Sequence, residues 1–167
     1  MKIGILFYSK SGNTKQIADR IKQQAEKKKH DVDLVEVNPE EEPGFFKASF
    51  SAIRQKPLPI QNDTFDVSSY DLLFIGCPIW VGKPAPLIKT MIQKTTGFNN
   101  TKASVFITCG GGEKPGSKAV DLIKSDLQEK QAMVLDETLI VHMDRKGKIR
   151  KEIPSVEDFV STVIESN

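Results

Sequence analysis

The chain has 167 residues, a length typical of one compact unit, so we expect a single domain over residues 1–167. Lys and Arg number 24 against 22 Asp and Glu, a balance too even to predict a nucleic-acid-binding protein. The longest nearly apolar run, Leu72–Gly82, is too short to predict a membrane span. The 2 cysteines cannot form a disulfide framework, which favours the reducing cytoplasm as the protein's location.

Apolar runs and helical spacing alternate along the chain. Some runs are almost continuously apolar, as are strands that helices cover on both faces. In others, apolar residues recur every three or four positions, as Ile17, Ile21 and Ala25 do, which indicates amphipathic helices. In chain order we expect strand Lys2–Tyr8, helix Asn13–Lys29, strand Asp31–Val37, helix Phe45–Arg54, strand Asp71–Cys77, helix Ala85–Lys94, strand Ala103–Cys109, helix Ser117–Lys130, strand Met133–Val141 and a helix after Ser155.

This alternation predicts an α/β fold, a doubly wound three-layer α/β/α sandwich around a five-stranded parallel sheet. The half-polar strands, Asp31–Val37 and Met133–Val141, are expected at the two edges, which selects the strand order 2-1-3-4-5. Ligands of such sheets bind outside the carboxyl ends of the strands, where the order reverses. The loops after the first, third and fourth strands therefore form the candidate site.

The first of these loops is small and polar, and it leads directly into a helix. Backbone N–H groups at a helix N-terminus favour a phosphate, and a glycine there lets the ligand approach closely. The alternative is that Ser11 or Asn13 only caps the helix. The candidate phosphate ligands are Ser9, Lys10, Ser11, Gly12, Asn13 and Thr14.

The second loop holds the only Trp of the chain. A Trp at a ligand-binding strand end offers a flat face on which a ring system can stack, and the alternative is a Trp that closes the core. The candidate residues of this loop are Pro78, Ile79, Trp80, Val81 and Gly82.

The third loop has three consecutive glycines directly after a central strand. Such a run loses much backbone entropy on folding unless a close approach requires it, so its amides are candidates to meet a polar ring edge; a loose loop is the alternative. The residues concerned are Thr108, Cys109, Gly110, Gly111 and Gly112.

The remaining chemistry-bearing residues give no metal or catalytic pattern. Cys77 and Cys109 end neighbouring strands, where a buried cysteine acting as a small hydrophobic residue is the favoured interpretation. His30 and His142 lie outside the three loops and are interpreted as surface residues. The basic cluster Arg145–Lys151 is interpreted as a turn before the last helix.

The three loops together resemble those of the flavodoxin-like FMN-binding proteins. The segment 8–14 (YSKSGNT) is similar to the phosphate loop of that family, 76–84 (GCPIWVGKP) to its flavin-stacking loop, and 108–112 (TCGGG) to the loop at the pyrimidine end of the flavin. The resemblance covers essentially the whole chain and implies FMN as cofactor. It also implies that Trp80 stacks on the flavin and that the first loop holds the phosphate.

The resemblance implies an electron carrier with a non-covalent flavin and no catalytic side chain. The electron carriers of that family are strongly acidic, and this chain is not. The alternative is therefore an FMN-dependent NAD(P)H:quinone or flavin oxidoreductase, so the partner is either a redox protein or NAD(P)H and a quinone. A third possibility, an interaction module that has lost its flavin, is disfavoured by the intact first loop. Enzyme or carrier, and the oligomeric state, stay open at this level.

Overall fold

The computed structural model describes residues 1–41, 44–54, 56–61, 64–99, 101–110, 113–144 and 146–166. Five parallel strands form the body of its main sheet, in the order β2-β1-β4-β7-β8. This confirms the predicted order 2-1-3-4-5 and places the carboxyl ends of these strands at one edge. The strands are β1 (Lys2–Phe7), β2 (Asp31–Glu36), β4 (Leu72–Trp80), β7 (Lys102–Cys109) and β8 (Met133–Met143).

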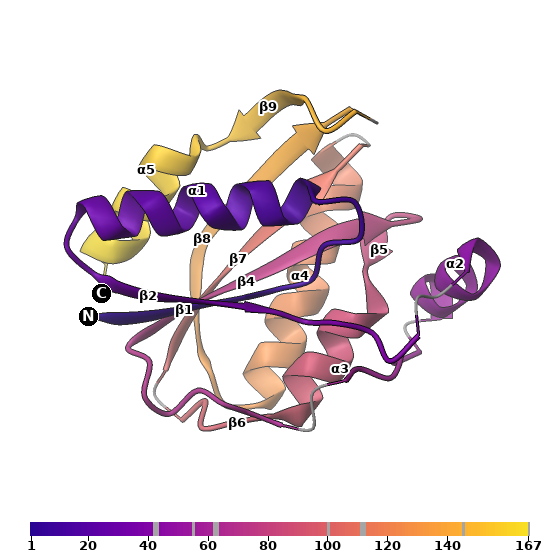
Figure 1. The fold of residues 1–167 in the computed structure, drawn as a ribbon, viewed down its shortest axis with the longest axis horizontal. Helices are drawn as coiled ribbons and strands as arrows, with labels where there is room; N and C mark the ends of the chain where they lie inside the picture. The colour runs from indigo at the N-terminus through magenta and orange to yellow at the C-terminus, as the bar shows by residue number, and fades with distance from the viewer. Residues whose placement is uncertain are drawn as a thin grey trace.

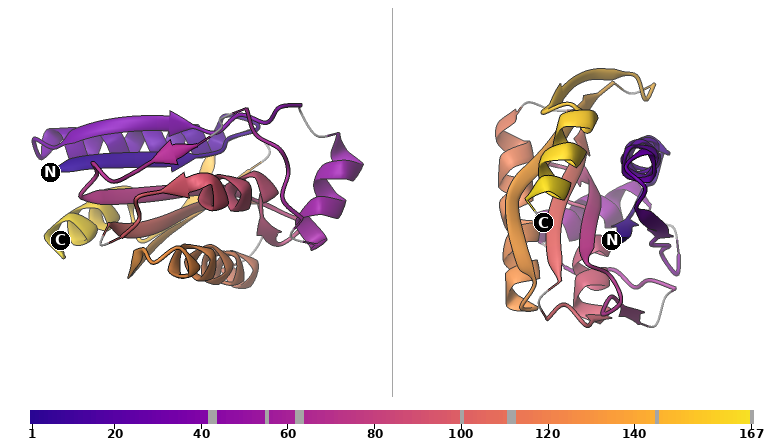
Figure 2. Two further views of the ribbon diagram at one scale, coloured as in Figure 1. Left: turned by 90° about the horizontal axis from the view of Figure 1, so that it is seen from below. Right: turned by 90° about the vertical axis from the view of Figure 1, so that its left-hand side faces the viewer.

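Helices cover both faces of the sheet, which makes the three layers visible in Figure 2. Helices α1 (Asn13–Lys27) and α5 (Val156–Glu165) pack on one face, against apolar side chains such as Ile5 and Phe74. Helices α3 (Pro86–Lys94) and α4 (Glu113–Glu129) pack on the other. The short α2 (Phe45–Arg54) projects beyond the carboxyl edge of the sheet in Figure 1. Among the described residues, no helix combines the length and apolarity that crossing a membrane requires.

The main sheet is larger than the five strands predicted. With the short strands, it has seven: β5 (Lys83–Pro84) pairs antiparallel with β4, and β9 (Ile149–Ile153) pairs antiparallel with β8. The prediction that the Met133 strand lies at the edge is therefore wrong, because β9 occupies that edge. Most of the basic cluster Arg145–Lys151 belongs to this hairpin and is not a simple turn. Two further strands, β3 (Phe65–Asp66) and β6 (Thr95–Thr96), form a separate pair.

The edge assignment failed because of a local irregularity. Asp136 and Glu137, the polar residues that suggested an exposed strand, lie where the register between β7 and β8 shifts. The Glu137 carbonyl accepts a hydrogen bond from the buried Ser104 hydroxyl at 2.7 Å. Beyond this bulge the strand continues with Leu139 and Val141 fully buried, as an inner strand requires.

Candidate functional site

A cavity of about 600 Å³ opens at the carboxyl edge of the sheet, where the strand order predicts a ligand site. This volume lies in the range of small-molecule and cofactor sites. Its lining comes from the three predicted loops and from the β8–β9 hairpin. The residues are Ser11, Asn13, Pro78, Ile79, Trp80, Thr108, Cys109, Gly110, Met143, Asp144, Lys146 and Arg150.

The loop between β1 and α1 begins the helix with a glycine. Gly12 is the N-cap residue of α1, with φ of 84°, a left-handed conformation that favours glycine. Because glycine has no side chain, the N-cap position itself supplies no side-chain hydrogen bond to the helix. The Ser9 hydroxyl instead accepts a hydrogen bond from the Lys15 amide at 3.1 Å. Ser11 and Asn13, on either side of Gly12, line the cavity. The uncharged donors expected to face a phosphate are thus at the helix start.

Thr14 lies elsewhere than the other polar residues of this loop. Its side chain is fully buried, and its hydroxyl lies 2.8 Å from the hydroxyl of Thr108. Thr108 lines the cavity, whereas Thr14 is absent from the described lining. The pair therefore joins the first loop to the end of β7 from beneath the cavity floor.

A two-residue turn between β4 and β5 presents Trp80. Val81 and Gly82 have φ of 49° and 75°, the signs that a tight type I′ hairpin requires. The Trp80 ring packs edge-on against Tyr8, with the ring centroids 5.6 Å apart and the planes at 82°. The Lys10 ammonium lies 5.6 Å from the Trp80 ring centroid. Trp80 therefore packs against Tyr8 of the core and also borders the cavity. Its position is compatible both with closing the core and with stacking on a ligand.

The two cysteines differ in their surroundings. Cys77 is fully buried; its thiol accepts a hydrogen bond from the Ala85 amide at 3.1 Å, and burial raises the pKa of this thiol far above its ordinary value. Cys109 lines the cavity, with its sulfur 3.6 Å from Nδ1 of His142. His142 is half-buried at the site, so its interpretation as a surface residue is wrong. Gly110 lines the cavity; Gly111 and Gly112 lie outside the described residues.

The sequence analysis missed the β8–β9 hairpin, which contributes Met143, Asp144, Lys146 and Arg150 to the lining. A signal was present, because a basic run follows a strand that ends at the same edge of the sheet as the predicted loops. The run was interpreted as a turn before the last helix, because it is basic and contains only one apolar side chain, Ile149.

The arrangement suits a phosphorylated ring cofactor. Helix-start amides with hydroxyl and amide side chains suit a phosphate, and an aromatic side chain suits a flat ring system. Ser11 and Asn13 face the same cavity as Trp80, so one molecule can reach both. Fold and site together define a flavodoxin-like protein.

Comparison with known proteins agrees. Residues 1–146 match the family described as NADPH-dependent FMN reductase, and the chain belongs to this flavodoxin-like, FMN-binding family. FMN is accordingly its cofactor. A flavoprotein from Lactobacillus acidophilus NCFM, solved in complex with FMN, is 30% identical over 87% of this chain and 94% of that chain, with a TM-score of 0.60.

Two flavodoxins of Bacillus cereus share the fold. Flavodoxin 2 is 20% identical over 100% of both chains with a TM-score of 0.67, and flavodoxin 1 is 22% identical over 99% of this chain and 96% of that chain with a TM-score of 0.62. No curated protein sequence matches the chain.

Proposed function

We propose that the protein is an FMN-dependent NAD(P)H oxidoreductase that passes electrons from a reduced pyridine nucleotide to a quinone or a second flavin. The observation that carries this proposal is the charge around the cavity. Its lining includes the cations Lys146 and Arg150 against the single carboxylate of Asp144, and Lys10 lies over Trp80. A carrier that docks on basic partners needs an acidic rim around its flavin, and the described lining of this cavity is not acidic.

In this proposal each of the three loops binds a different part of the cofactor. Ser11, Asn13 and the amides that begin α1 bind the phosphate, Trp80 lies against the ring system, and Gly110 presents its backbone to the ring edge. When bound, FMN supplies the redox chemistry, and the protein supplies position and electrostatics. The site residues of the first two loops that do not line the cavity, such as Ser9 and Gly82, shape these loops.

Steady-state kinetics test the proposal directly. Protein loaded with FMN is mixed with excess NADPH and a quinone, and NADPH consumption is followed by absorbance. We expect saturable turnover, with kcat on the order of 1–1000 s⁻¹. Consumption of a single equivalent of NADPH per protein, without further turnover, would contradict the proposal and assign the protein to the electron carriers.

Trp80 tests whether FMN occupies this cavity. Trp80→Ala is expected to lower FMN affinity by about 1–3 kcal/mol because ring burial is lost. Since Trp80 is the only Trp, its fluorescence reports FMN binding without interference from another residue of that type. Unchanged fluorescence at saturating FMN would show that this ring does not face the cofactor.

A further inference from the structure

The described part of the β8–β9 hairpin approaches the beginning of α1 closely. One carboxylate oxygen of Asp144 accepts hydrogen bonds from the amides of Lys146 and Lys148, at 2.9 and 3.0 Å. The Asp144 amide donates to the Lys148 carbonyl at 2.9 Å. Gly147 has φ of 78°, and a Cβ atom there would lie 2.8 Å from the side-chain oxygen of Asn13. The hairpin therefore reaches the first residue of the helix whose start borders the cavity.

A bulge in the same hairpin lies at Arg150, which is one of two cations, with Lys146, that line the cavity. His142 pairs with Lys151 and Met143 with Ile149, so Arg150 is an extra residue without a partner in the β8 register. Bulges of this kind re-aim a side chain, and they are frequent beside active sites. The Arg150 side chain lines the cavity together with Lys146.

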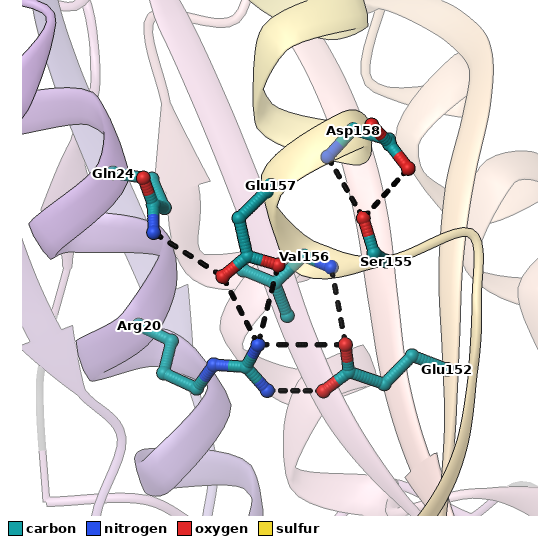
Figure 3. Close-up of polar contacts among 7 residues, drawn as sticks. All are labelled: Arg20, Gln24, Glu152, Ser155, Val156, Glu157 and Asp158. Atoms are coloured by element: carbon teal, nitrogen blue, oxygen red, sulfur yellow. Dashed lines mark hydrogen bonds and ion pairs between the residues drawn. The ribbon is translucent and has the colours of Figure 1, made fainter.

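An ion-pair network fixes the base of the hairpin. Arg20 of α1 binds Glu152 of β9, and it also donates to Glu157 of α5 at 3.2 Å (Figure 3). The second carboxylate oxygen of Glu152 accepts from the Val156 amide at 3.3 Å. Since the first loop leads directly into α1 at Asn13, the hairpin and that loop are tied to one helix.

In the described part of the cavity lining, the two cations share one acidic neighbour, Asp144. Neither Lys146 nor Arg150 forms an ion pair with a described residue, and both side chains are exposed. The pKa of Asp144 lies below its ordinary value because of backbone hydrogen bonds, the Lys148 amide first, and because of the positive charges of Arg150 and Lys148. That carboxylate is therefore ionised at neutral pH, and the described lining that the hairpin contributes carries one negative charge against two positive charges.

We propose that Lys146 and Arg150 form a cationic subsite for the phosphate group of FMN, in the cavity that the neutral donors Ser11 and Asn13 also line. A phosphate monoester carries about −1.5 to −2 charges at neutral pH, and the neutral donors leave this charge uncompensated. Two cations that line the same cavity supply the compensation. The subsite rests on the cavity assignment proposed above. The family match ends at residue 146, so Arg150 lies outside it.

Titrations of the FMN-free full-length chain test this subsite, with flavin fluorescence as the readout and no turnover involved. FMN and riboflavin, which lacks the phosphate, are titrated into the wild type, Lys146→Gln, Arg150→Gln and the double variant. Lys148→Gln is the matched control, because it removes the same charge from the same hairpin at a residue absent from the described lining. Thermal unfolding of each variant checks that the fold is retained.

We expect each single variant to weaken FMN binding about three- to tenfold and the double variant by more. Riboflavin affinity and the control should change less than twofold, and the dependence of FMN affinity on salt should become shallower in the double variant. Equal losses in Lys148→Gln, or equal losses for riboflavin, would overturn the subsite.

Two other outcomes separate this subsite from the assignment on which it rests. A wild-type preference for FMN over riboflavin that survives unchanged in the double variant overturns only the role of Lys146 and Arg150. If, in addition, the double variant raises the KM for NADPH but not for NADH, the two cations serve the nucleotide's extra phosphate and not FMN. A wild type that binds FMN no more tightly than riboflavin overturns the phosphate position on the α1 loop as well.

Discussion

The Arg20 guanidinium of α1 binds the Glu152 carboxylate of β9, and this ion pair joins the helix that follows the first loop to the hairpin that also lines the cavity. Both side chains are largely buried, at 29% and 15% exposed, so solvent screens the pair less than a surface pair. Arg20→Met leaves the Glu152 and Glu157 carboxylates without their shared cation.

We expect Arg20→Met to lower the free energy of unfolding by about 1–2 kcal/mol in urea titrations. Lys28→Met is the matched control, because Lys28 also links α1 to α5, through Glu165, but in an exposed pair whose side chains are 38% and 74% accessible. The control should cost less than about 0.5 kcal/mol. Similar losses in both variants would show that the Glu152 contact adds nothing beyond surface charge.

The buried hydrogen bond between Thr14 and Thr108 leads to a second prediction. Thr14→Val keeps the shape of the side chain but leaves the Thr108 hydroxyl unpaired, so we expect a stability loss of about 1–3 kcal/mol. FMN and riboflavin should be weakened alike, since Thr14 does not line the described cavity. In Ser11→Ala, by contrast, FMN should be weakened about three- to tenfold and riboflavin little. A Thr14→Val effect confined to FMN would place this hydroxyl on the phosphate.

The turn that presents Trp80 stores backbone strain. Val81 has φ of 49°, an uncommon conformation for a β-branched residue, and its side chain is 60% exposed, so little burial compensates the strain. Val81→Asn should raise the free energy of unfolding by about 1 kcal/mol, because Asn tolerates this conformation in type I′ turns. Gly82→Ala, at φ of 75°, should do the opposite. A less stable Val81→Asn protein would mean that the Val81 side chain makes contacts worth more than the strain.

The convergence of the three loops on one cavity could be predicted from the sequence because local patterns determine it. The apolar runs identify the central strands, parallel strands share one carboxyl edge, and the loops at that edge must then meet. Helix Phe45–Arg54 has the predicted bounds. The last helix follows Ser155 as predicted, and Ser155 caps it, since its hydroxyl accepts from the Asp158 amide at 3.1 Å.

The hairpin could not be predicted in this way because its position depends on tertiary contacts. Its pairing with β8 includes a bulge at Arg150, and its tip is placed by the close approach of Gly147 to Asn13, residues far apart in the sequence. The buried role of Thr14 has the same origin, because only the fold brings Thr108 to within hydrogen-bond distance. Sequence patterns report which loops converge, but not which side chains of a loop point inward.

Tyr70 allows a test of pH dependence. Its hydroxyl donates to the Asp33 carboxylate at 3.0 Å, and burial together with this hydrogen bond raises the pKa of Tyr70 to about 12. Because the folded state favours the protonated phenol, the resulting stability is fully present below the ordinary pKa near 10. It is lost as the pH rises toward 12. The difference in unfolding free energy between wild type and Tyr70→Phe should therefore shrink over this range, and a constant difference would contradict the shift.

The contrast between the two cysteines gives the last prediction. Cys109 is 6% exposed and borders the cavity beside His142, whereas Cys77 is fully buried. Burial raises the pKa of the Cys77 thiol, so its reactive thiolate form is scarce. Alkylation of the native protein with iodoacetamide should therefore modify one thiol, at Cys109, and saturating FMN should slow that reaction at least about tenfold by covering the cavity.

Two variants show which cysteine iodoacetamide alkylates. Cys109→Ala should abolish the modification, and Cys77→Ala should leave its rate and its protection by FMN unchanged. The alkylated protein should bind FMN weakly, because the added group occupies volume that the cofactor needs. A Cys109 thiol that reacts at the same rate with and without FMN would show that the bound cofactor leaves this end of the cavity open. The loop after β7 would then lie outside the FMN contact surface, while the contacts of the first two loops would stand.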